Sequence, residues 1–91
     1  MNSKQSLLIV EQDEGLNAFL SRFFHKEYAI HAADNAIGAL KYLYKGDLPQ
    51  LMIVDLNLPD LSGKELIDQV KTNGILRDIP IIALCMSLIH I

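Results

Sequence analysis

Two groups of acidic residues follow apolar runs and could act together in one site. Asp55 directly follows the apolar residues 51–54 and precedes a turn-forming stretch, and Glu11 directly follows the apolar residues 7–10. An ionisable side chain at the tip of a buried strand lies where the sheet meets solvent, which is the edge where open parallel sheets bind ligands. Without a metal ion, two carboxylates at that edge would repel each other, which should raise the pKa of one of them.

The apolar runs predict strands, and the segments between them predict helices. The predicted strands are residues 7–10, 28–32, 51–54 and 81–84, and the stretches between them carry apolar residues at helical spacing. Strands that alternate with amphipathic helices pair in parallel through right-handed crossovers. The sequence therefore predicts an α/β fold with Glu11 and Asp55 at one edge of a parallel sheet.

Each predicted helix begins at a residue that could cap its N-terminus. These residues are Asp13, Asp34 and Ser62, and Glu65 follows Ser62 at the spacing of a capping box. The second helix should end at Gly46 and the third near residues 73–74. The stripes predicted to face the core are Leu16, Phe19, Leu20 and Phe23; Ile37, Leu40, Leu43 and Tyr44; and Leu66, Ile67 and Val70.

Length and composition argue against several classes of function. The 91 residues predict one domain over residues 1–91, and the net charge of −3 comes without a cluster of Lys and Arg, which disfavours nucleic-acid binding. The chain has no apolar stretch of the roughly 18 residues that span a bilayer, so we expect no membrane role. The single cysteine, Cys85, predicts a cytoplasmic location and is expected to pack as a small core residue.

Three segments resemble the receiver domain of two-component response regulators, a CheY-like family. They are residues 7–13 (LLIVEQD), 54–63 (VDLNLPDLSG) and 79–84 (IPIIAL), and the resemblance extends over nearly the whole chain. It implies a flavodoxin-like, doubly wound parallel sheet in the order 2-1-3-4. That sheet is expected to be incomplete, because the sequence stops at Ile91, before the family's fourth helix, fifth strand and fifth helix.

The resemblance also implies roles for individual residues. Asp55 would accept a phosphoryl group from a histidine kinase or a phosphotransfer protein. Glu11, Gln12, Asp55 and the backbone carbonyl of Asn57 would hold Mg²⁺, which offsets the negative charge that gathers during phosphoryl transfer. Cys85 stands at the switch position, where the family has Thr or Ser.

Three departures from the family pattern predict impaired phosphorylation or switching. Gln12 replaces a carboxylate that ligates Mg²⁺ directly in the family, so the affinity for Mg²⁺ should be weak. The Cys85 thiol is a weaker hydrogen-bond donor than a hydroxyl. The phosphate-binding lysine of the fifth strand is missing, and neither Lys64 nor Lys71, both on the third predicted helix, can stand in for it.

Other classes of function stay open beside this prediction. The first is a pseudo-receiver that is not phosphorylated and acts as a protein-interaction or dimerisation module. A small phosphohydrolase is disfavoured because Asn57 stands where such enzymes need an acid, and a flavin carrier because no phosphate-binding loop follows the first strand. We therefore expect no enzymatic activity beyond self-phosphorylation.

The apolar residues 85–91 predict self-association. An exposed apolar edge of a sheet recruits another chain, so we expect a homodimer or larger assembly joined through these residues, with strand exchange as one route. The three histidines, His25, His31 and His90, have no partner at metal-ligand spacing and are expected to be structural or solvated.

Overall fold

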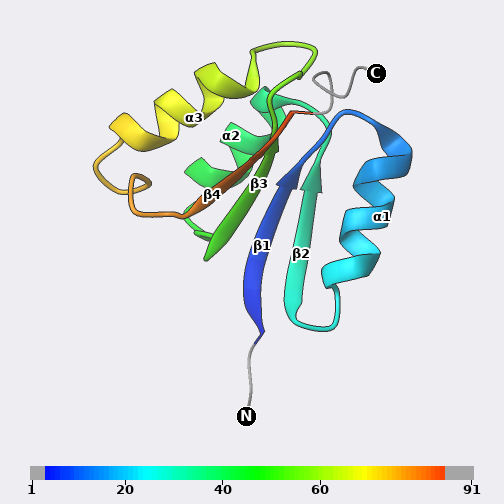
Figure 1. Ribbon diagram of the computed structural model, residues 1–91. Helices are drawn as coiled ribbons and strands as arrows, with labels where there is room; N and C mark the ends of the chain where they lie inside the picture. The colour runs from blue at the N-terminus through cyan, green and yellow to red at the C-terminus, as the bar shows by residue number, and fades with distance from the viewer. Residues whose placement is uncertain (1–3, 86–91) are drawn as a thin grey trace.

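The computed structural model describes residues 4–85, in which strands and helices alternate along the chain (Figure 1). The strands are β1 (Gln5–Val10), β2 (Tyr28–Ala33), β3 (Leu51–Asp55) and β4 (Ile81–Leu84), and the helices are α1 (Glu14–Phe24), α2 (Ala36–Tyr44) and α3 (Gly63–Thr72). All strand pairs are parallel, and their order in the sheet is β2-β1-β3-β4. The predicted flavodoxin-like, doubly wound α/β fold is confirmed.

Strand β1 lies in the middle of the sheet and sets the position of its neighbours. Its residues 7–10 are fully buried, as the central strand of a parallel sheet covered on both faces requires. Val10 is in register with Ala33 of β2 on one side and with Val54 of β3 on the other. The chain therefore leaves all three strands at the same edge of the sheet.

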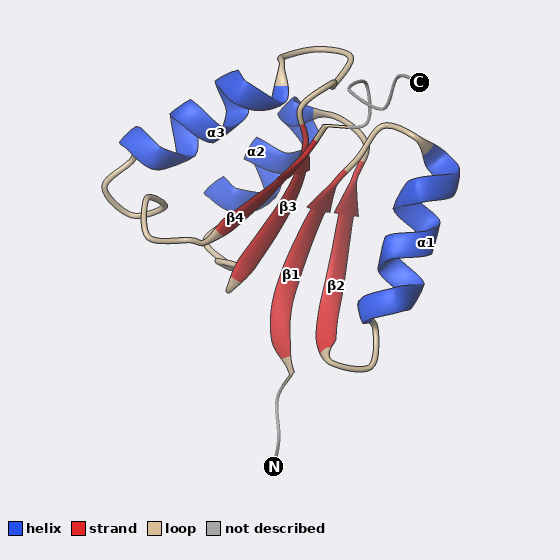
Figure 2. Cartoon of the chain, in the orientation of Figure 1, coloured by secondary structure: helices blue, strands red, loops and turns tan. Residues whose placement is uncertain are grey.

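The helices cover the two faces of the sheet unequally, with α2 and α3 on one face and α1 on the other (Figure 2). The cluster under α2 and α3 has twelve buried residues: Leu8, Val10, Ala36, Ala39, Leu43, Met52, Val54, Leu58, Leu66, Val70, Leu76 and Ile79. The cluster under α1 has three: Leu7, Ile9 and Ile53. Most of the hydrophobic stabilisation therefore comes from one face.

The stripe predicted for α1 is only half right. Phe19 and Phe23 are 62% and 65% exposed and stack on each other, so the prediction that they belong to the core is wrong. Leu20, which the predicted stripe contains, and Phe24, four residues later, are the side chains of α1 that pack against the sheet. The helix carries two adjacent apolar stripes, and only one of them can face the sheet.

The caps of α1 and α3 are as predicted, and that of α2 is not. Asp13 accepts a hydrogen bond from the Leu16 amide, and Ser62 and Glu65 form a capping box. In α2 the cap is Asn35, whose side chain accepts from the Gly38 amide, because the helix starts one residue later than Asp34 would place it.

The buried face of α2 also differs from the prediction. It consists of Ala36, Ala39 and Leu43, whereas Ile37 and Tyr44 are 50% and 61% exposed. The small side chains of the two alanines let the helix approach the sheet closely. Gly46, with a φ of 101°, follows the helix and ends it as expected.

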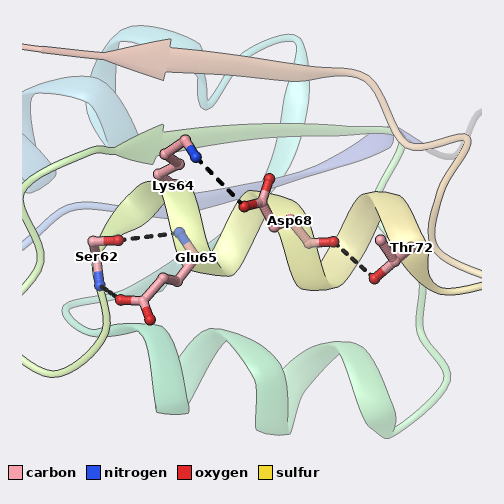
Figure 3. Close-up of polar contacts among 5 residues, drawn as sticks. All are labelled: Ser62, Lys64, Glu65, Asp68 and Thr72. Atoms are coloured by element: carbon pink, nitrogen blue, oxygen red, sulfur yellow. Dashed lines mark hydrogen bonds and ion pairs between the residues drawn. The ribbon is translucent and has the colours of Figure 1, made fainter.

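The start of α3 lies against the end of β3. Figure 3 shows the capping box of Ser62 and Glu65 together with an exposed ion pair between Lys64 and Asp68. Gly63 is buried, and a Cβ atom at this position would overlap the backbone of residues 55–56. The glycine is therefore what allows the helix to begin so close to Asp55.

Within residues 4–85, no helix combines the length and the apolar character that crossing a membrane requires. Of the segment predicted to mediate self-association, only Cys85 belongs to the described residues, and His90 lies outside them as well.

Candidate functional site

The register of the sheet brings Glu11 and Asp55 to the same edge. Val10 of β1 is paired with Val54 of β3, and Glu11 and Asp55 are the next residues of the two segments. Their exposed fractions are 2% and 5%, and they are the buried charged residues of the described part of the chain. The structure thus brings together the two carboxylates that the sequence singled out.

Backbone amides hold one oxygen of each carboxylate. The Asp13 amide donates to Glu11 Oε2, and the Asn57 amide donates to Asp55 Oδ1, both at 2.9 Å. The Asn17 side chain donates to the main-chain carbonyl of Glu11 at 2.9 Å and so fixes the loop between β1 and α1. Both carboxylates are therefore oriented by the loops that follow their strands.

The other oxygen of Glu11 is exceptional among the described residues. Glu11 Oε1 is buried and accepts no hydrogen bond. Burial raises the pKa of Glu11 from 4.5 to about 7; the Asp13 amide opposes this rise, and the nearby Asp55 carboxyl adds to it. The predicted repulsion between the two carboxylates thus contributes to the pKa of Glu11, but loss of hydration is the larger cause.

Gln12 bonds to the β3–α3 loop through its nitrogen. Its Nε2 donates to the backbone carbonyl of Asn57 at 2.5 Å. The sequence predicted that both groups would supply oxygen atoms to a metal ion. In the structure, an amide hydrogen of Gln12 is instead directed at the carbonyl oxygen of Asn57.

The carboxylates border a cavity of about 570 Å³ at the carboxyl edge of the sheet. It is lined by Glu11, Gln12, Asp13, Glu14, Leu16, Asp55 and Asn57. A second cavity of about 590 Å³ lies on the other side of Glu11, toward β2 and α2.

The donor set of the first cavity fits a hard divalent cation in part. The unpaired oxygen Glu11 Oε1 is the kind of ligand that Mg²⁺ prefers. Within residues 4–85, however, no three side chains of His, Cys, Asp or Glu gather closely enough to hold a metal ion. A cation here would depend on two carboxylates, Glu11 and Asp55, and on neutral oxygens.

Cys85 directly follows Leu84, which is paired with Asp55. It is exposed, so the expectation that it packs in the core is wrong. The reason is that β4 is the outer strand of the described sheet, and no described element covers its end.

The two lysines of α3 have partners away from the pocket. Lys64 pairs with Asp68, and Lys71 donates to the backbone carbonyls of Arg77 and Ile79. Among the histidines, His31 stacks on Tyr42 with ring centroids 3.8 Å apart, and His25 Nδ1 lies 2.8 Å from the carbonyl of Arg22.

Turn or cap chemistry is what the sequence predicts for Asp60, but the sequence does not say which helix it caps. Its two carboxylate oxygens accept from the amides of Ala36 and Ile37 at 2.9 Å, so this residue of the β3–α3 loop caps helix α2. Desolvation acts to raise the pKa of Asp60, but the amides of Ile37 and Ala36 outweigh it and lower the pKa. The signal in the sequence is an acidic residue in the β3–α3 loop, which lies at the edge of the sheet where the helices begin.

Comparisons with known proteins bear on this site. The family model of the response regulator receiver domain matches residues 7–88. A histidine kinase from Formosa agariphila is 35% identical over 81 residues, which are 89% of this chain but 6% of the kinase. This chain therefore spans a small part of that relative.

Two solved structures share the fold. A phosphorylated phytochrome response regulator from a cyanobacterium superposes with a TM-score of 0.87 at 21% identity, over 94% of this chain and 68% of that one. A manganese-bound response regulator gives a TM-score of 0.81 at 24% identity, over 92% of this chain and 67% of that one.

Proposed function

Because the chain belongs to the response regulator receiver domain family, whose model matches residues 7–88, we propose that Asp55 accepts a phosphoryl group from a histidine kinase or a phosphotransfer protein. The observation that carries this proposal is the buried pair of Asp55 and Glu11 at the carboxyl edge of β1 and β3. The domain is thus a receiver of two-component signalling, and its chemistry would be self-directed and not that of an enzyme with turnover.

In the proposed reaction, a carboxylate oxygen of Asp55 forms a bond to phosphorus. The bond from phosphorus to the donor breaks, and the donor leaves with its electron pair. The Asn57 amide, which donates to Asp55 Oδ1, would hold the carboxylate in position during the attack.

A divalent cation would support this step. Glu11, Asp55 and the Asn57 carbonyl are the groups that would hold it, and within residues 4–85 no N–H or O–H group donates to Glu11 Oε1. When bound, the cation supplies positive charge against the repulsion between carboxylate and phosphoryl oxygens. Gln12 is neutral, so we expect weak binding of Mg²⁺.

Intact-mass spectrometry tests the proposal. The protein is incubated with a small-molecule phosphodonor and Mg²⁺, beside Asp55→Asn and a matched control, Asp68→Asn, which removes an exposed carboxylate of α3. We expect one phosphoryl adduct on the parent and on Asp68→Asn, and none on Asp55→Asn. An unmodified parent at high Mg²⁺ would contradict phosphorylation of Asp55.

A pseudo-receiver is the second candidate, and one observation favours it. The Gln12 amide already bonds to the Asn57 carbonyl, which is one of the groups that the cation needs. In that case the domain acts through its surfaces, and an unmodified parent is the expected result of the mass measurement.

We further propose that the domain is cytoplasmic and that it self-associates through residues 85–91. Support for self-association comes from β4, which is the outer strand of the described sheet and carries Ile82 with 49% of its surface exposed. Support for the cytoplasm comes from a composition with one cysteine.

A further inference from the structure

The hydrogen bond from Gln12 to Asn57 joins the two loops of the pocket. It links the residue after Glu11 to the loop after Asp55, across 45 positions of the chain. Asn57 is also held on its other side, because its backbone amide donates to the Asp55 carboxylate. The two loops of the pocket are therefore joined by a contact that uses no carboxylate and no cation.

This contact and cation binding make opposite demands on the same oxygen. The Asn57 carbonyl accepts the Gln12 amide at 2.5 Å, so a hydrogen with partial positive charge is directed at it. A cation at that oxygen would meet this hydrogen at close range, and like charges repel. Gln12 can present its own oxygen to a cation only if the side-chain amide turns over, which breaks the bond.

We propose that Gln12 is a latch that competes with a divalent cation for the Asn57 carbonyl. The inference rests on the proposed function, since it assumes that the pocket takes a cation at all. It assigns Gln12 a role opposite to that of a weakened ligand: the side chain holds the two loops together when no cation is bound and opposes cation binding. Gln12 is thus a positioning residue for the two loops.

The two roles of Gln12, latch and metal ligand, predict opposite changes in cation affinity for the same substitution. Gln12→Ala removes the amide and adds no ligand. If Gln12 is a latch, the variant binds Mn²⁺ about two- to tenfold more tightly, because one exposed hydrogen bond no longer opposes binding. If Gln12 is a ligand, the variant binds more weakly.

The experiment is a titration of the full 91-residue chain with Mn²⁺, followed by calorimetry and by the electron paramagnetic resonance signal of free Mn²⁺. Gln69→Ala, at an exposed position of α3, is the matched control and should leave the dissociation constant unchanged. Gln12→Asp removes the latch and adds a carboxylate, so it should bind most tightly. Equal or weaker binding by Gln12→Ala overturns the latch.

Failure of the latch and failure of the proposed function give different results. If the parent or Gln12→Asp binds Mn²⁺ and Gln12→Ala is not tighter than the parent, only the latch is wrong. If neither the parent nor Gln12→Asp binds Mn²⁺, the cation site itself is wrong, and the latch with it. A second readout is the side-chain NH₂ signal of Gln12 in nuclear magnetic resonance, which should shift when Mg²⁺ is added.

Discussion

At the scale of single residues, the burial of Glu11 makes stability fall as pH rises. The pKa of this carboxyl is about 7 in the folded protein against 4.5 for an ordinary glutamate, so the folded state binds more protons between these values. The difference corresponds to roughly 3 kcal/mol at pH 8. Glu11→Gln should therefore be more stable than the parent at pH 8, and this advantage should vanish below about pH 4.5.

Urea denaturation with a chelator present measures this effect at pH 4, 6 and 8. The quantity to compare is the free energy of unfolding of the variant minus that of the parent, because this difference cancels the titration of other groups. Glu14→Gln, at the exposed first residue of α1, is the control and should show no such trend. A constant difference between Glu11→Gln and the parent would show that the pKa of Glu11 does not change on folding.

The chemistry of the pocket could be predicted at this scale, but its contacts could not. Asp55 and Glu11 could be identified because each directly follows an apolar run, and a carboxylate there lies where a buried strand meets solvent. The bond between Gln12 and Asn57 depends on which end of an amide faces a carbonyl, and residue order carries no signal for that. The exposure of Cys85 depends on what covers the end of β4, which is equally non-local.

At the scale of elements, the junction of β3 and α3 depends on Gly63. A methyl group at this position would overlap the carbonyl oxygen of Asp55 and the Cα of Leu56. Gly63→Ala should therefore destabilise the protein by about 1–3 kcal/mol, because the helix and the end of the strand must separate. The same shift should lower the rate of phosphorylation of Asp55.

Gly74→Ala is the matched control for this substitution. No atom lies within 4 Å of the position of the new methyl group, and the backbone of Gly74 does not have a positive φ. The control should gain about 0.5 kcal/mol from the reduced freedom of the unfolded chain. Thermal unfolding followed by circular dichroism measures the melting temperature of each variant. Equal melting temperatures for Gly63→Ala and Gly74→Ala would contradict the proposed overlap.

Elements were predicted well where local signals agreed and poorly where they competed. The capping box of Ser62 and Glu65 fixed the start of α3, and the strand Ile81–Leu84 was predicted at its observed bounds. In α2, Asp34 and Asn35 are both good caps, and the choice between them depends on Asp60 from a distant loop. In α1, two apolar stripes are adjacent, so periodicity alone does not identify the buried one.

At the scale of the whole molecule, the outer strand β4 is the feature that bears on self-association. Ile82 on this strand is 49% exposed, and an apolar outer strand offers both side chains and backbone groups to another chain. Light scattering at micromolar concentration should give the mass of a dimer or a larger assembly. Ile82→Lys should shift the protein toward the monomer, because a charged side chain on an outer strand opposes strand pairing.

Ile75→Lys provides the comparison, since Ile75 is 76% exposed and lies outside the sheet. It adds the same charge and should leave the mass unchanged. A parent that is monomeric at micromolar concentration would count against self-association, and equal masses for Ile82→Lys and the parent would show that Ile82 is not part of the surface used.

The overall architecture was the most predictable level. Four apolar runs separated by helical spacing allow few arrangements once right-handed parallel crossovers are assumed, and the order β2-β1-β3-β4 is the one that the family resemblance implied. The unequal covering of the two faces could not be predicted, because it depends on the exact side that each helix presents.

The central position of β1 has a consequence for how the protein folds. β1 leaves the ribosome before both of its neighbours in the sheet, yet its partner β3 follows some forty residues later, after β2. Closing the larger loop costs more chain entropy and is slower, so the pairing of β1 with β2 should precede the pairing of β1 with β3. Glu11 and Asp55 belong to the two strands of the later pairing. A nascent or partly unfolded chain can therefore contain native structure around β1, α1 and β2 while the two carboxylates of the pocket are still apart.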